Sequence, residues 1–220
     1  MGREGGVESL YPFLYAGDAD LDSVLAQVRR STVEKAAEIV ALRRLVVERD
    51  LPRLVDCARA MARSFADGGR LFSFGNGGSS SDAQAVAATF LHPGPGRRPL
   101  PAWSLTDDVA VLTALANDVG FEVVFARQIA AFAKPGDVAV GLSTSGNSDN
   151  LIRAFEEASR RGLLTVGLAG YQGGKMAEVD TIDHLFVVPS SSVHRIQEAQ
   201  TTTYHVLWEL TQAALAADGS

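Results

Sequence analysis

The fold is decided by residues 71–82, which read LFSFGNGGSSSD. The first four residues are typical of a buried strand, and they lead into glycines and then into Ser and Asp, which often begin helices. Gly77 and Gly78 carry no Cβ, so backbone N–H groups are open to a bound anion. The helix expected after them would point its positive end at the same place. We therefore expect a ligand-binding turn between strand and helix.

A second turn of the same kind follows at residues 138–148, which read VAVGLSTSGNS. It has fewer glycines and many hydroxyl groups, and Ser143, Thr144, Ser145 and Ser148 are all able to donate to phosphate oxygens. Two such turns at the carboxyl edge of a parallel sheet form one ligand crevice. Ser80 stands where a Gly-x-Gly-x-x-Gly motif would need its last glycine, so a nicotinamide cofactor is not expected.

Strand and helix patterns alternate from residue 71 to the end of the chain. We predict strands at 71–75, 102–105, 138–143, 164–168 and 184–188, with helices at 80–91, from 109, at 121–133, 148–161, 173–179 and 193–217. This alternation predicts an α/β fold with a doubly wound parallel sheet.

Two helices are expected ahead of the sheet, at residues 20–50 and 51–66. Their apolar faces exceed what one small domain covers, which favours helix–helix oligomerisation. We divide the chain into an N-terminal extension at 1–20, a helical oligomerisation segment at 21–69 and a main domain at 70–217. The extension holds an aromatic patch at 11–15 that is suited to docking on a partner or on the chain itself.

Composition excludes several classes of protein. The 220 residues suffice for one well-buried domain. The net charge of −6 argues against a nucleic-acid-binding surface. The single Cys57 suits a reducing compartment and a core position. Neither a membrane-spanning stretch nor a signal core is visible in the sequence, so we expect a cytoplasmic protein.

Four motifs together resemble the SIS (sugar isomerase) fold and, more narrowly, the phosphoheptose isomerase family, which converts sedoheptulose 7-phosphate to the corresponding aldose. They lie at 75–84, 116–121, 143–148 and 195–199. The resemblance implies a flavodoxin-like five-stranded sheet, a homotetramer with N-terminal helices at the subunit contacts, and a sugar phosphate as ligand. The positions that match the family's substrate contacts are Asn76, Gly77, Gly78, Asn117, Asp118, Ser143, Thr144, Ser145, Ser148 and Gln197.

The family's metal and acid–base set comprises a His, a Glu, a Gln and a second His. Ala85 and Thr89 stand at the first two positions, whereas Gln197 and His205 match the others. His205 is therefore the remaining candidate catalytic residue, and Gln197 with His205 would be the only metal ligands. Catalytic zinc normally has three protein ligands, so the main expectation is that no cofactor binds, and zinc held by Gln197 and His205 is the alternative. We predict a protein that binds a sugar phosphate with isomerase turnover weak or absent.

Two alternatives remain open. One is an active isomerase that has rebuilt its base from His205 and another group. The other is a non-catalytic, protein-binding regulator like the tetrameric relative that associates with the bacterial replication initiator DnaA. That group also lacks the catalytic Glu but usually keeps the His that Ala85 replaces here.

Overall fold

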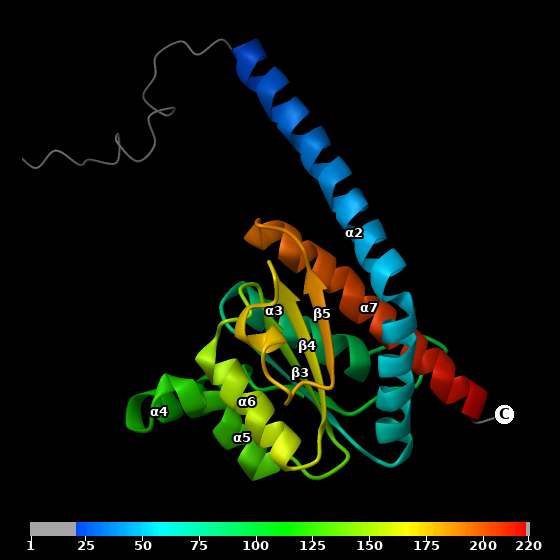
Figure 1. The fold of residues 1–220 in the computed structure, drawn as a ribbon, viewed down its shortest axis with the longest axis vertical. Helices are drawn as coiled ribbons and strands as arrows, with labels where there is room; N and C mark the ends of the chain where they lie inside the picture. Colours follow the sequence, from blue (N-terminus) through cyan, green and yellow to red (C-terminus); the bar gives the residue numbers. More distant parts are fainter. Residues whose placement is uncertain (1–20, 219–220) are drawn as a thin grey trace, which may run out of the picture. The chain divides into compact units, whose positions relative to one another are not determined.

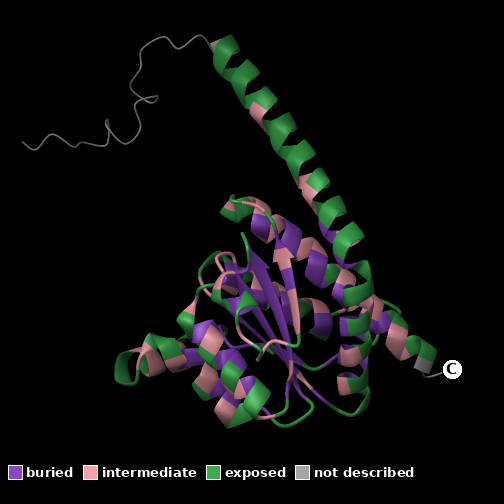
Figure 2. Cartoon of the chain, in the orientation of Figure 1, coloured by how far each residue is buried: buried purple, intermediate pink, exposed green. Residues whose placement is uncertain are grey.

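A computed structural model of the chain describes residues 21–218 (Figure 1). The aromatic patch at 11–15 lies outside the described residues. The chain divides into two compact units, residues 1–40 and 41–220. The helix α2 (Leu21–Ala66) passes from the first unit into the second. Within the first unit, most residues from 22 onward are exposed (Figure 2).

The second unit is built on a five-stranded parallel sheet, as predicted. Its strands are β1 (Leu71–Gly75), β2 (Ala102–Ser104), β3 (Val138–Ser143), β4 (Leu164–Gly170) and β5 (His184–Val188). Their order is β2-β1-β3-β4-β5, and every neighbouring pair is parallel. The order reverses next to β1, so the carboxyl ends of β1 and β3 lie side by side at the switch point where such folds bind ligands.

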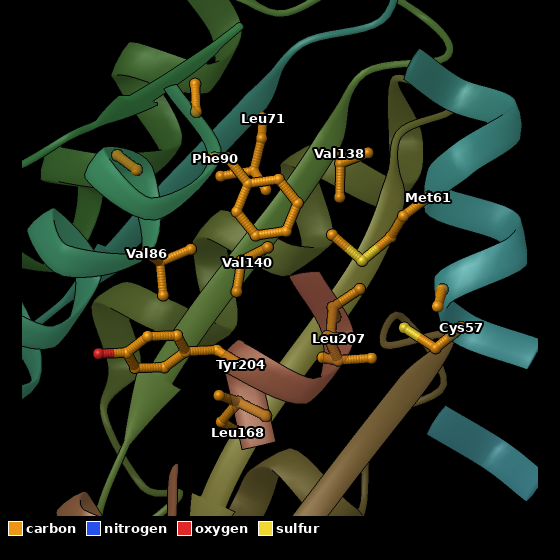
Figure 3. Close-up of a cluster of buried hydrophobic side chains, with 14 of the residues drawn as sticks. Cys57, Met61, Leu71, Val86, Phe90, Val138, Val140, Leu168, Tyr204 and Leu207 are labelled. Atoms are coloured by element: carbon orange, nitrogen blue, oxygen red, sulfur yellow. The ribbon is translucent and has the colours of Figure 1, made fainter. Parts of the chain in front are cut away.

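Helices cover both faces of the sheet. One face packs against α3 (Gly78–Leu91), α7 (Val193–Asp218) and the residues of α2 from Leu54 onward. The other packs against α5 (Val124–Phe132) and α6 (Asp149–Arg160). Figure 3 shows the first core, in which Phe90, Val140 and Leu207 come together from three different elements. Burial raises the pKa of the Cys57 thiol in this core to about 12, so Cys57 is an inert core residue, as expected.

The sheet residues alternate between these two cores because successive side chains of a strand point to opposite faces. Leu71 belongs to the first core and Phe72 to the second. Gly141 lies on the second face, where a Cβ would meet the rings of Phe74 and Phe155. A glycine is therefore required at this position for the two aromatic rings to pack against this face of the sheet.

The prediction of two helices before the sheet was wrong, because α2 is one helix of 46 residues with Pro52 inside it. Proline removes a backbone hydrogen bond but does not end the helix here. Residues on either side of it are anchored: Asp50, which is 1% exposed, accepts hydrogen bonds from Arg49 and Arg53. These arginines also donate to the carbonyl oxygens of Val187 and Leu185 on the edge strand β5. We call this group the Asp50 clamp.

Three shorter elements also differ from the sequence predictions. The α3 helix starts two residues early, and its N-cap is Gly77 without a side-chain cap instead of a Ser or Asp. The segment expected as one helix at 121–133 is a 3₁₀ turn, η2 (Phe121–Val123), followed by α5. The residues 117–120 predict a turn, but the helix α4 (Val109–Asp118) includes the first two of them; its N-cap is Asp108. Among the described helices, none is long and apolar enough to cross a membrane.

Candidate functional site

The hydroxyl loop, residues 143–148, joins β3 to α6 and is held by its own polar groups. Ser143 Oγ accepts from the Gly146 N–H at 3.0 Å and lies 3.2 Å from Ser148 Oγ. Gly146 has a φ of 69°, which favours glycine. Ser148 is the N-cap of α6, but its side chain makes no capping hydrogen bond. The first N–H groups of the helix therefore remain available to an anion.

A second loop supports the hydroxyl loop from outside. It follows β4 and contains the 3₁₀ turn η3 (Gly174–Ala177). The Met176 N–H donates to the Gly146 carbonyl, and the Lys175 N–H donates to Asn147 Oδ1 at 2.9 Å. Gly170 lies so close to the Thr144 carbonyl that a Cβ would overlap it. These contacts fix the path of the hydroxyl loop.

The glycine loop, residues 75–78, joins β1 to α3. Gly77 has a φ of 57° and a Cβ there would meet nothing within 4 Å. Gly78 is different, because a Cβ there would overlap the side-chain amide of Gln197. The structure thus brings Gln197, from α7, directly against the glycine loop.

An amide pair joins the glycine loop to the first turn of α6, which directly follows the hydroxyl loop. Asn76 Nδ2 donates to Asn150 Oδ1, and Asn150 Nδ2 donates to Asn76 Oδ1, both at 2.9 Å. Asn150 is 3% exposed and lies in the first turn of α6. Asn76 is half-buried.

Asn117 and Asp118 lie in the last turn of α4, where both are exposed. Asn117 Nδ2 donates to Asp118 Oδ1 at 2.8 Å. In the part of the chain that the structure describes, no hydrogen bond joins this pair to either loop. The structure therefore unites the glycine loop, the hydroxyl loop and Gln197, but leaves Asn117 and Asp118 as a separate pair.

The positions of the family's acid–base set hold no catalytic carboxylate. Ala85 packs against the first core, and the Thr89 hydroxyl donates to the Ala85 carbonyl at 2.7 Å. His205 is exposed, and its ring packs on Tyr204 at a centroid distance of 4.8 Å. Across residues 21–218, no three His, Cys, Asp or Glu side chains are grouped to hold a metal ion. These residues do not fit the zinc site that the family resemblance implies.

One acidic side chain lies near this region. Asp82 is half-buried on α3, and its Oδ2 is buried without a hydrogen-bond partner. Burial raises the pKa of Asp82 above its ordinary value of 3.8. Burial also raises the pKa of the Tyr204 phenol, and the nearby Asp82 carboxylate adds to this effect.

An apolar cavity of about 370 Å³ lies apart from these loops, beside the edge strand β2. Its lining includes Phe72, Trp103 and Phe132, and its only basic residue, Arg70, is bound to the buried Asp137. A phosphate needs free donors, which this lining does not offer. The hydroxyl loop, which leads into the uncapped N-terminus of α6, is the better site for an anion.

Sequence reasoning missed two residues of the site, Asn150 and Gln200. Gln200 is completely buried, and its Nε2 donates to the Ser143 carbonyl at 3.5 Å while its Oε1 has no partner. Both lie just beyond a recognised motif: Asn150 two residues after Ser148, and Gln200 three residues after Gln197 on the same helix face. The sequence signal for both is an amide side chain just after a recognised motif, and the structure adds that both side chains are buried.

The sequence of this chain is similar to a family model and to known proteins. The family model described as SIS domain matches residues 32–170. A phosphoheptose isomerase from Aquifex aeolicus is 46% identical over 167 residues, which cover 76% of this chain and 86% of that protein. The phosphoheptose isomerase from Roseiflexus sp. is 40% identical over 187 residues, covering 84% of this chain and 94% of its own.

A solved structure shows the same fold. The phosphoheptose isomerase of Neisseria gonorrhoeae aligns with a TM-score of 0.78 and 34% sequence identity. The alignment covers 84% of this chain and 99% of that one.

Proposed function

This chain belongs to the phosphoheptose isomerase family of SIS-domain proteins, and from that membership we propose that it binds a sugar phosphate of the sedoheptulose 7-phosphate type with isomerase turnover weak or absent. The proposal is supported by a contrast: the glycine loop and the hydroxyl loop are held in place by hydrogen bonds, whereas two of the four positions of the family's acid–base set carry other residues. The loops that would hold the ligand are in place, whereas Ala85 and Thr89 supply neither a base nor a metal ligand.

The phosphate is assigned to the hydroxyl loop. Neutral hydroxyl donors and the open N-terminus of α6 are suited to a dianion, since they stabilise charge without a counter-ion of their own. The sugar then extends toward the glycine loop, where the partly exposed amide of Asn76 and the amide of Gln197 are able to hydrogen-bond hydroxyl groups.

Aldose–ketose isomerisation needs a base that moves a proton between neighbouring carbons, and a group that stabilises the developing oxyanion. His205 is the one ionisable residue left from the family's set; it is exposed, and its imidazole lies against the Tyr204 ring at an interplanar angle of 33°. Thr89 cannot act as a base at neutral pH. We therefore assign binding, and not turnover, as the main activity, without a metal cofactor.

The test is the melting temperature with and without sedoheptulose 7-phosphate, followed by a turnover assay on the same sample. Binding to the native state raises the melting temperature by mass action. We expect stabilisation without product, and a chelator should leave the stabilisation unchanged. Product formed at a rate typical of enzymes would overturn this reading in favour of a rebuilt active site, and H205A would then show whether His205 belongs to it.

A hydroxyl-loop variant sharpens the test. T144V removes one donor to the phosphate and should weaken binding roughly 10- to 100-fold, because a hydrogen bond to a charged group contributes roughly 1.5–3 kcal/mol. T113V is the matched control, since the Thr113 hydroxyl donates only within α4. Equal affinities for T144V and T113V would contradict the placement of the phosphate. No stabilisation of the wild-type protein would instead favour the protein-binding alternative.

A further inference from the structure

Side-chain hydrogen bonds between Asn76 and Asn150 lie just beyond the last backbone pairing of β1 with β3. The β1–β3 ladder pairs residues up to Gly75 and Leu142. Beyond that point the glycine loop and the hydroxyl loop diverge into separate helices, and the reciprocal bonds between Asn76 and Asn150 join them again. The amide pair thus links the glycine loop to the helix that follows the hydroxyl loop.

The two partners of this pair are not equivalent. Asn150 is 3% exposed and sits in the first turn of α6, so the helix holds its side chain and little of it meets solvent. Asn76 is half-buried, in a loop next to a glycine with positive φ. A side-chain amide has two N–H donors and two acceptor lone pairs. The pair uses one of each, which leaves Asn76 one donor and one acceptor for a ligand.

We infer that Asn150 is a positioning residue, which holds Asn76 and the glycine loop at the spacing from the hydroxyl loop that one sugar phosphate requires. The inference rests on the proposed function, and it adds a role for a residue that lies behind the crevice. A loop that is already fixed in its binding geometry avoids the cost of being ordered by the ligand. Losing Asn150 should therefore reduce affinity for a ligand that touches both loops.

Two ligands separate this role from a general effect on the fold. Inorganic phosphate reaches only the hydroxyl loop, whereas sedoheptulose 7-phosphate reaches both. We expect N150A to bind sedoheptulose 7-phosphate about tenfold more weakly than wild type, as for the loss of one well-made polar contact. Its affinity for inorganic phosphate should be unchanged. Both constants are measurable by isothermal titration calorimetry on the full chain.

A double variant tests whether Asn150 acts through Asn76. If it does, N150A has no further effect once Asn76 is gone, so N76A/N150A should bind sedoheptulose 7-phosphate as N76A does. N150L is a second variant that keeps the buried volume if N150A does not fold. T165V is the matched control, because it removes a buried hydroxyl that bonds Asp183 near the opposite, amino edge of the sheet. It should leave both affinities unchanged.

Three results would overturn the inference: an unchanged affinity of N150A for sedoheptulose 7-phosphate, an equal loss for both ligands, or additive losses in the double variant. The proposed function is judged on wild type alone. If wild type binds neither ligand, the proposed function fails and this inference falls with it. If wild type binds and the variants behave in one of the three ways above, only the role of Asn150 is refuted.

Discussion

Tyr171 follows β4 directly and is the one residue other than glycine, within the described chain, that has a positive φ, at 53°. A bulky residue in this left-handed conformation is strained by about 1–3 kcal/mol. Tyr171 is 38% exposed. The loop that it begins is the one that supports the hydroxyl loop, and the strain is therefore located beside the site.

We predict that Y171G increases the free energy of unfolding by about 1 kcal/mol, because glycine adopts positive φ without strain. Part of this gain is lost, because glycine also increases the conformational entropy of the unfolded chain. Urea denaturation measures this difference. Y171F, which keeps the strain, should match wild type. A less stable Y171G would mean that contacts of the ring outweigh the backbone strain.

A second residue-scale prediction concerns Asp82. Because burial raises its pKa, the folded state disfavours the ionised carboxylate. Below pH 3.8 both states hold the proton and the effect vanishes; as the pH rises through the raised value, stability is lost. D82N should therefore melt at a higher temperature than wild type at pH 7.5, with a smaller difference at pH 4. The reverse order at pH 7.5 would show that the carboxylate is stabilising.

Residue-scale chemistry was partly predictable from the sequence. The turn at 143–148 between β3 and α6 was predictable because strand-to-helix turns have a stereotyped geometry. The pairing of Asn76 with Asn150 was not predictable, because it joins residues 74 positions apart through side chains alone. The separation of Asn117 and Asp118 from the loops likewise depends on where α4 lies, and local patterns do not encode that position.

At the scale of elements, the strands were the most predictable parts. Each buried strand is a short apolar run between turn residues, and β1, β3 and β5 have the predicted bounds. Proline in α2 was the main cause of error. Proline usually marks a helix end. Here the buried contacts from Leu54 onward and the Asp50 clamp hold the residues on both sides of Pro52 in one helix.

The packing of α6 on the sheet leads to an element-scale prediction. G141A should lower the free energy of unfolding by about 2 kcal/mol, because the added methyl group overlaps the rings of Phe74 and Phe155. Thermal denaturation would measure the loss, and an unchanged circular dichroism spectrum before heating would show that the variant folds. As a control, G136A tests positive φ without crowding, since nothing lies within 4 Å of its Cβ position. A neutral G141A would show that the rings move apart readily.

At the scale of the whole molecule, the exposed apolar residues of α2 are the main feature to explain. Val24, Leu25, Val28 and Val33 are each more than 40% exposed, although a soluble helix normally turns such residues inward. We propose that they are covered by other copies of the chain in a homotetramer, as the sequence led us to expect.

This proposal predicts that L25E/V28E lowers the molar mass in solution, because charged side chains cannot be buried in a helix–helix contact without a partner. Sedimentation equilibrium gives the mass directly. Q27E, on the same helix, adds a charge at a polar position and should leave the assembly intact. A wild-type protein with the mass of a single 23.3 kDa chain would refute the proposal.

The Asp50 clamp has a consequence for the protein's behaviour at high concentration. A parallel sheet has two open edges, and an edge of unpaired backbone groups recruits strands from other molecules into aggregates. On one edge, β2 is only three residues long. On the other, two guanidinium groups occupy the carbonyl oxygens of Leu185 and Val187, so an incoming strand must displace two charged donors that Asp50 holds in place. The clamp therefore disfavours self-association through the β5 edge of the sheet. A variant without Asp50 should form fibres sooner than the wild-type protein on heating.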